Sequence, residues 1–322
     1  MMYFAVFLVL FVLELLYFRI ADKFNIIDKP NHRSSHTQIT LRGGGIIFPI
    51  AFVLYFVLSA VYRKDYFLPE DYWSFGLGLF LLSTISFLDD ILDLSSKLRL
   101  LFHFVAVTLL IYFLGLFTSA PIWFIPLVYI FVIGVLNAYN FMDGINGITG
   151  VYSLVMLLTF YYINQYGVTF TDAHFIIYPI LASLVFLFFN FRKRAKCFAG
   201  DVGSMSIAFW VLALLGLLMV KTEDFTYLLF IAVYGIEVIS TILQRIKLKE
   251  NIFEAHRHHL YQLLVNQMKW SHLLVSTMYG VIQLLINFSI IYWKLNFVEG
   301  ILYLIFPTLI MYVLAKFYIF KT

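Results

Sequence analysis

The residues best suited to chemistry lie in four short polar segments that long apolar stretches separate. These segments are Asp89–Asp93, Asn137–Asn146, Arg192–Ser204 and His256–His259. They hold carboxylates, amides, cations and imidazoles, which bind metal ions and phosphates or move protons. Because they are far apart in the chain, they can act together only if the fold brings them to one place.

The first segment is rich in carboxylates. Asp89 and Asp90 are adjacent, and Asp93 would share a helix face with Asp89 if the helix continues. Adjacent carboxylates repel each other, so holding them together requires a cation or a shared proton. Lys97 and Arg99 follow and could neutralise the cluster or bind phosphate. A solvated helix end is the alternative interpretation of this segment.

The second segment, extended to Gly150, is the most specific pattern in the chain. It places three Asn, one Asp and three Gly between two apolar stretches. Such oxygen donors suit a hard cation such as Mg²⁺, which also keeps substrate phosphates in its shell. A helix that starts near Gly147 would direct its free N–H groups at an anion. A tight Asn/Gly turn would explain the glycines but not so many oxygen donors.

The third segment places four cations before a single carboxylate, Asp201, which lies between glycines where an apolar stretch begins. A carboxylate buried there needs a partner, and a metal ion is the natural one. Phe198 could stack on a base, although a core or lipid contact is the more common role of such an aromatic residue. The basic run by itself is typical of a membrane-surface anchor.

The fourth segment combines imidazoles with a guanidinium. His256, Arg257, His258 and His259 lack the ligand spacing of a structural zinc site, but they could bind a diphosphate or a sugar. An interfacial amphipathic helix is the alternative. The basic, glycine-rich segment 28–45 also resembles an entrance for an anion.

The elements that must position these residues are membrane helices. Of the 322 residues, 62% are hydrophobic and only 12% are charged, against about 25% charged in soluble domains. The single cysteine excludes a disulfide framework. Residues 1–18 are apolar without a basic start, so they indicate a first spanning helix rather than a signal peptide.

The apolar stretches predict an all-α, polytopic bundle of about eleven spans that forms one integral membrane domain over residues 1–322. Each stretch approaches the roughly 20 residues of a spanning helix and is too long for a barrel strand. The predicted spans are residues 2–20, 46–62, 73–88, 100–117, 121–138, 147–163, 174–190, 204–220, 226–243, 272–293 and 299–318.

Lysine and arginine predict the orientation. When the spans are threaded alternately through a bilayer, all basic residues fall on one face except Arg63, Lys64, Lys221 and Lys294. The basic face is the cytoplasmic one. The four polar segments all emerge on this face, with the N-terminus outside and the C-terminus inside the cell.

Together, the segments supply oxygen ligands for a divalent cation, cations for phosphates and an aromatic ring for a base. This set favours phosphoryl transfer from a soluble nucleotide-linked donor to a membrane-bound acceptor. The alternative is a transporter or flippase for an anionic or lipid-linked solute, which would carry polar residues near the bilayer midplane. Glu14 and Glu237, inside the first and ninth predicted spans, are the features that favour it.

The motifs resemble those of the polyprenyl-phosphate N-acetylhexosamine-1-phosphate transferases, which are related to the peptidoglycan translocase. The resemblance covers almost the whole chain and keeps the family's motif order: the 28–45 loop, DDILD at 89–93, NAYNFMDGING at 137–147, FAGDVGS at 198–204 and HRHH at 256–259. It implies transfer of a sugar 1-phosphate from a UDP-N-acetylhexosamine to undecaprenyl phosphate, with release of UMP and use of Mg²⁺ or Mn²⁺. It also implies the inner membrane of a bacterium, a cell-wall or O-antigen pathway and no nucleic-acid partner. Both a monomer and a homodimer remain open.

The resemblance also implies roles for single residues. Asn140 and Asp201 match the metal ligands, and Asp143 matches a further acidic position near the metal. Asp89 and Asp90 match the aspartate pair that deprotonates the lipid phosphate or orients the metal site.

The substrate residues follow in the same way. Arg99 falls where a basic residue meets the diphosphate, Phe198 where the uracil is stacked, and Asn146 where the uracil edge is hydrogen-bonded. The residues expected at the sugar-phosphate end are His256, Arg257 and His258. Direct attack by the lipid phosphate is the expected mechanism, with a double displacement through an aspartyl-phosphate as the alternative.

Overall fold

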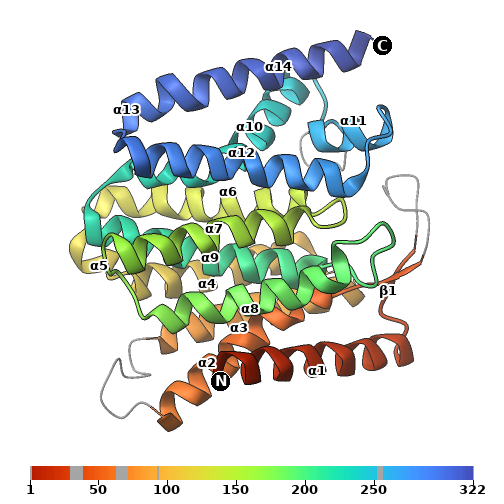
Figure 1. The fold of residues 1–322 in the computed structure, drawn as a ribbon, viewed down its shortest axis with the longest axis vertical. Helices are drawn as coiled ribbons and strands as arrows, with labels where there is room; N and C mark the ends of the chain where they lie inside the picture. The colour runs from red at the N-terminus through yellow and green to blue at the C-terminus, as the bar shows by residue number, and fades with distance from the viewer. Residues whose placement is uncertain (1, 30–38, 63–71, 93, 252–256, 322) are drawn as a thin grey trace.

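The computed structural model describes residues 2–29, 39–62, 72–92, 94–251 and 257–321, and in these ranges the protein is a bundle of long helices (Figure 1). The predicted all-α membrane fold is therefore confirmed. The long helices are α1 (Met2–Lys23), α2 (Ile47–Tyr62), α3 (Trp73–Leu92), α4 (Ser96–Phe113), α6 (Ile125–Met142), α7 (Ile148–Tyr166), α8 (Ala173–Asn190), α9 (Gly200–Thr222), α10 (Ala232–Lys247), α12 (His272–Trp293) and α14 (Phe306–Lys321). The short elements are β1 (Ile27–Asp28), β2 (Thr40–Leu41), α5 (Leu116–Ser119), α11 (Leu260–Asn266) and α13 (Phe297–Gly300).

Ten helices of the described chain are long and apolar enough to cross a membrane. The remaining predicted span, 147–163, forms α7, which has 19 residues but a more polar composition. Helix α7 packs between α8 and α12, and most of its small polar side chains are buried inside the protein. Asn164, for example, is buried and accepts hydrogen bonds from the backbone of Phe170 and Thr171.

Helices α3 and α9 extend further into the polar segments than the hydrophobicity alone predicts, and α4 also begins earlier than predicted. Helix α3 continues to Leu92 and α9 begins at Gly200, so both acidic motifs lie on helix ends. Helix α4 begins at Ser96, where the Ser95 hydroxyl accepts a hydrogen bond from the backbone N–H of Leu98. Such a cap satisfies one of the free N–H groups of a helix start.

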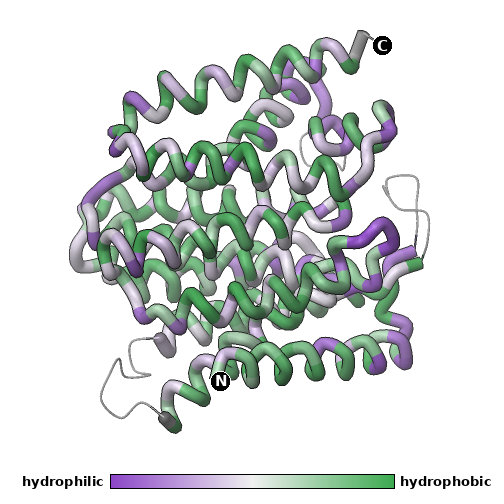
Figure 2. The backbone as a smooth tube through the Cα atoms, viewed as in Figure 1, coloured by the Kyte–Doolittle hydropathy of each residue, from purple (hydrophilic) through white to green (hydrophobic). Residues whose placement is uncertain are grey.

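Helix α9 is the centre of the bundle and packs against α3, α6, α7 and α8. Of its most apolar window, 83% is buried, against 11% for the window that includes α14. A helix that is apolar all round is expected in such a fully enclosed position. Figure 2 shows apolar residues along the lengths of the helices and hydrophilic residues mainly at their ends and in the loops.

The segment after α1 is attached to the start of α9. Strands β1 and β2 pair antiparallel, and the carbonyl of Leu41 accepts a hydrogen bond from the N–H of Phe198 at 2.8 Å. The N–H of Gly44 donates back to the carbonyl of Phe198 at 2.8 Å. A Cβ on Gly45 would collide with the Cα of Gly203, so glycine allows the two backbones to meet. The attachment places residues 39–46 beside the third polar segment.

Candidate active site

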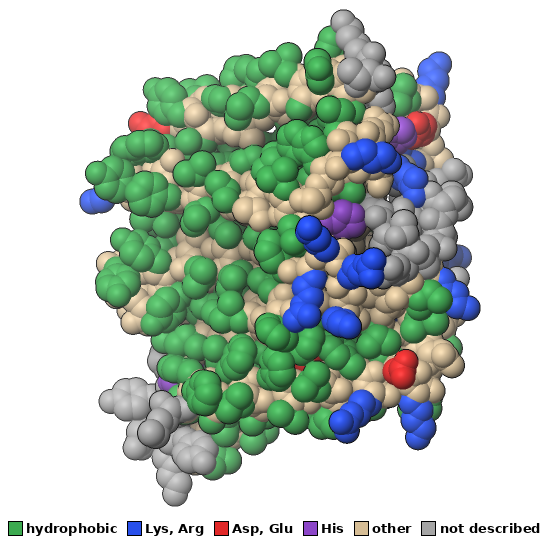
Figure 3. Space-filling view, turned by 45° about the vertical axis from the view of Figure 1, so that its right-hand side comes forward, with side chains coloured by type: hydrophobic (Ala, Val, Ile, Leu, Met, Phe, Trp, Pro, Cys, Tyr) green, Lys and Arg blue, Asp and Glu red, His purple; other side chains and the backbone are tan. Residues whose placement is uncertain are grey.

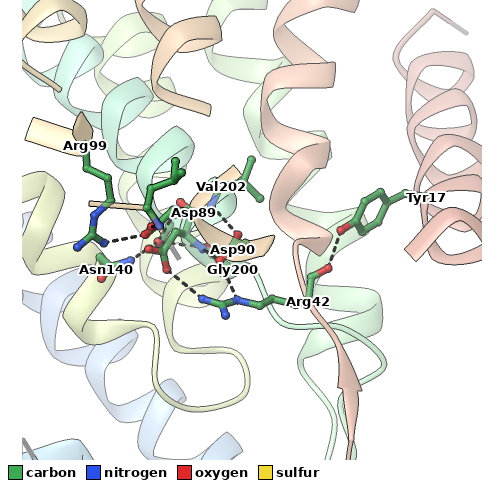
Figure 4. A network of polar contacts seen from close by, with 11 residues as sticks. Tyr17, Arg42, Asp89, Asp90, Arg99, Asn140, Gly200 and Val202 are labelled. Carbon is green, nitrogen blue, oxygen red and sulfur yellow. Dashed lines mark hydrogen bonds and ion pairs between the residues drawn. The ribbon is translucent and has the colours of Figure 1, made fainter. Parts of the chain in front are cut away.

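Asp90 lies at the end of α3 and binds the start of α9 (Figure 4). Its carboxylate accepts hydrogen bonds from the backbone N–H groups of Asp201, at 3.0 Å, and Val202, at 3.2 Å. Arg42 completes the contact, with Nε 2.7 Å from Oδ1 of Asp90. The Asp90 side chain is fully buried. A carboxylate here offsets both the free N–H groups and the positive end of the α9 dipole.

Gly200 makes this contact sterically feasible. Its φ of +70° lies in the left-handed region, and a Cβ at this position would lie 2.5 Å from Oδ2 of Asp90. A side chain would therefore be strained and would also push the carboxylate away.

Asp89, the other member of the pair, faces α4. Its Oδ2 accepts a hydrogen bond from Arg99 at 2.7 Å, and its Oδ1 accepts one from the N–H of Leu94 at 2.8 Å. The predicted diphosphate residue Arg99 is thus paired with the predicted catalytic residue Asp89. The Arg99 side chain is 38% exposed, so part of it remains accessible to a ligand.

Asn140 and Asp201, the predicted metal ligands, come together from α6 and α9. The Asn140 amide donates a hydrogen bond to the Asp201 side chain and lies 3.4 Å from the hydroxyl of Ser204. Arg42 approaches Asp201 as well, with 3.6 Å between its guanidinium nitrogen and Oδ1. Asn140 and Asp201, which are 61 residues apart in the sequence, therefore belong to one polar cluster.

Asp143 adds a second carboxylate to the surroundings of Asp201. Burial, with a smaller contribution from the negative charge of Asp201, raises the pKa of Asp143 to about 7. No group of three His, Cys, Asp or Glu side chains with metal-binding geometry is found among the described residues. The cluster instead offers carboxylate, amide and hydroxyl oxygens. This donor set fits Mg²⁺, which takes one or two carboxylates and completes its shell with water and phosphate.

Asn146, predicted at the uracil edge, is buried and holds a neighbouring loop. Its side-chain amide nitrogen donates a hydrogen bond to the backbone carbonyl of Arg192 at 2.8 Å. Its backbone carbonyl accepts one from the hydroxyl of Ser276 at 2.8 Å. Asn190 makes a similar link, because it accepts from Gly147 N–H. The start of α7 is therefore attached to the third polar segment. Phe198, which belongs to this third segment, is partly buried.

The fourth segment approaches this site through α11. His256 lies outside the described residues, whereas Arg257 and His258 are partly buried. Nε2 of His258 lies 3.2 Å from Glu250. The hydroxyl of Tyr261 donates a hydrogen bond to the carbonyl of Phe141 at 2.8 Å. Helix α11 thus packs against the end of α6, one residue from Asn140.

Sequence reasoning did not single out three of the residues that build this site. Arg42 lies directly before Gly43–Gly45, and this position beside a flexible turn is the signal that would have found it. Ser204 lies one turn after Asp201 on α9. Asn190 gave no signal, because a lone amide at a helix end is common.

Fold and site together define a multi-pass membrane protein whose polar centre lies where several helices end. The model of the family described as "Glycosyl transferase family 4" matches residues 72–220. Over these residues the chain is similar to this family.

Curated relatives extend the match beyond residues 72–220. A probable undecaprenyl-phosphate N-acetylglucosaminyl 1-phosphate transferase of Bacillus subtilis is 29% identical over 264 residues, which cover 77% of this chain and 72% of the relative. An undecaprenyl-phosphate α-N-acetylglucosaminyl 1-phosphate transferase of Thermotoga maritima is 24% identical, with 84% and 83% covered. A phospho-N-acetylmuramoyl-pentapeptide-transferase of Petrotoga mobilis is 27% identical, with 83% and 84% covered.

Proposed function

We propose that the protein transfers an N-acetylhexosamine 1-phosphate from a UDP-sugar to undecaprenyl phosphate. The products are UMP and a polyprenyl-diphosphate sugar, which begins a cell-surface glycan. One observation carries the proposal: the ends of α3, α4, α6 and α9 and the loop that holds Arg42 bring carboxylates, an amide and two arginines into one cluster. The names of the relatives support the same reaction.

The orientation of the chain fits a cytoplasmic donor. Segments 24–29, 39–46 and 190–200 and helix α11 lie at one end of the bundle (Figure 1). Most Lys and Arg side chains visible in Figure 3 gather toward this same end. Basic residues accumulate on the cytoplasmic side of membrane proteins. We therefore place the cluster at the cytoplasmic surface, where a UDP-sugar is available and a lipid phosphate can enter from the bilayer.

Asn140 and Asp201 would hold a divalent cation, Mg²⁺ or Mn²⁺, with Asp143 close by. Once bound, the ion would offset negative charge on the diphosphate. Arg42 and Arg99 add positive charge at the same place, which favours binding of the diphosphate and stabilises the charge that develops during transfer.

The contacts of Asp90 favour direct attack by the lipid phosphate. Its carboxylate is buried and already accepts hydrogen bonds from α9 and Arg42, so it is poorly placed to act as a nucleophile or base. The lipid phosphate needs little help, because a phosphate monoester with its second pKa near 6 is mostly dianionic at pH 7. An oxygen of this phosphate attacks the β-phosphorus of the UDP-sugar, the bond to the UMP oxygen breaks, and UMP leaves. In our proposal, the paired side chains of Asp89 and Arg99 lie beside the reacting phosphates.

The test is an assay of UMP release by membranes that contain the protein. They are incubated with undecaprenyl phosphate, Mg²⁺ and each of a panel of UDP-N-acetylhexosamines. We expect release with at least one donor and only when the lipid phosphate is present. Release of no UMP with any donor would contradict the reaction. UDP-sugar/UMP exchange without lipid would contradict direct attack and support an aspartyl-phosphate.

A further inference from the structure

A row of buried polar residues runs along one face of α10. Glu237, Thr241 and Arg245 are spaced four residues apart and therefore share this face. Their relative exposures are 1%, 0% and 3%. Lipid offers such groups no partners, so side chains and backbone of the protein must satisfy them.

Glu237 collects donors from three other elements. Its Oε1 accepts a hydrogen bond from the N–H of Leu260 at 2.5 Å, at the start of α11. Its Oε2 accepts one from Tyr279 of α12 at 2.6 Å, and Tyr312 of α14 lies 3.2 Å from Oε1. Nδ1 of His259 lies 3.3 Å from Oε1. Charged acceptors make hydrogen bonds about twice as strong as neutral ones, so this carboxylate is a firm attachment point.

Arg245, two turns further along α10, binds the beginning of the segment that connects α10 to α11. Its guanidinium donates hydrogen bonds to the carbonyl of Asn251 at 2.5 Å and to Glu250 at 3.0 Å. Glu250 in turn lies 3.2 Å from His258. The chain is therefore attached to α10 at two places: at Glu250 and Asn251, before the His256–His259 motif, and at His259 and Leu260, where the motif ends.

Helix α14 supports the same face from outside. Nζ of Lys316 donates hydrogen bonds to Thr241 at 3.0 Å and to Gln244 at 2.8 Å. The window that includes α14 is only 11% buried, so these polar contacts contribute much of what attaches α14 to the bundle.

We infer that Glu237 is a positioning residue for the sugar-phosphate end of the donor. It fixes His259 and Leu260, and so sets where Arg257 and His258 stand, one to three residues earlier in the chain. The inference rests on the proposed function, which gives those two side chains their ligand. It also gives Glu237 a role other than transport, because both carboxylate oxygens already accept hydrogen bonds from the protein.

The test compares E237Q with the wild type, using the full chain purified in detergent. The amide keeps the shape but turns an N–H₂ group toward a donor, so one contact becomes repulsive. We expect the KM for the UDP-sugar to rise roughly tenfold, the effect of one charge-assisted hydrogen bond, while the KM for undecaprenyl phosphate stays unchanged. E299Q is the matched control: Glu299 caps α13 by accepting from the N–H of Asn296 at 2.9 Å, and α13 lies at the opposite end of the bundle (Figure 1).

A second readout does not depend on turnover. Trypsin cleaves after Arg257, and we expect faster cleavage there in E237Q than in the wild type or E299Q. Tyr279→Phe, which removes one donor but keeps the charge, should shift the KM and the cleavage rate in the same direction by a smaller amount. This variant carries the test if E237Q does not fold.

Two results would overturn the inference. One is wild-type KM values and cleavage rates in a folded E237Q. The other is a lower melting temperature with unchanged KM, which would mean that Glu237 only stabilises the bundle. A wild type that releases no UMP would instead refute the proposed function, while the trypsin comparison would still test the attachment.

Discussion

Replacing Asp90 by asparagine tests whether this member of the aspartate pair builds the site rather than performs the chemistry. The carboxylate binds Arg42 at 2.7 Å and two N–H groups of α9 at 3.0 and 3.2 Å. Asparagine has one oxygen left for these three donors, and its N–H₂ group would face one of them. The start of α9 would then lose its cap, and Arg42 would lose its closest partner.

The cost follows from these contacts. Breaking a buried ion pair by removing one partner costs about 3–5 kcal/mol. Arg42 is 34% exposed, so water compensates part of this loss and the lower end, about 3 kcal/mol, applies. We therefore expect D90N to unfold several degrees below the wild type in detergent. Turnover should fall as well, because Asp201 follows directly on the uncapped helix start.

The decisive comparison is between melting temperature and activity. Both are measured on purified D90N and on the matched variant D89N, whose 10% exposed carboxylate is bound by only one arginine and one N–H. D89N should melt close to the wild type. If D90N melts like the wild type and yet releases no UMP, Asp90 acts in the reaction itself and our reasoning is wrong.

Three further changes probe the same cluster. Asp201→Asn should abolish UMP release and leave the protein folded in detergent; near-normal rates would refute the metal assignment. Gly200→Ala should destabilise the protein by about 1–2 kcal/mol through its positive φ alone, with added strain against Asp90; an unchanged melting temperature would contradict the geometry. Arg99→Gln should change stability by less than about 1 kcal/mol, since its ion pair with Asp89 is partly exposed, and should raise the KM for the UDP-sugar; an unchanged KM would remove Arg99 from the diphosphate site.

The sequence predicted the helices well because lipid leaves a chain few choices. A spanning segment must be apolar and helical, so the pattern alone located every long helix. Helix α7 is not among the ten helices apolar enough to cross a membrane, and several of its polar side chains are buried inside the bundle. The helix ends were predicted less well, since caps such as Ser95 extend a helix into polar sequence.

The sequence indicated which residues belong to the candidate site but not which of them contact each other. Asn140 and Asp201 are hydrogen-bonded to each other, and their role as metal ligands stays a prediction. The partners of Asp90, however, lie more than a hundred residues away on α9, and Arg42 comes from a loop that carried only a weak signal. Long-range pairing of this kind follows from how helices pack, which a single sequence does not encode in local spacing.

The polar side chains around this site have a second task, which explains why so many of them bind backbone. Each helix end leaves N–H or C=O groups without partners, and an end buried inside the protein has no water to supply them. Asp90 satisfies the start of α9, Tyr261 the end of α6 and Glu237 the start of α11. Because the helix ends are fixed in this way, the side chains of Asn140 and Asp201 are held at one place without having to stabilise the fold themselves. In the proposed function, the residues that satisfy these helix ends would therefore also set where the donor binds.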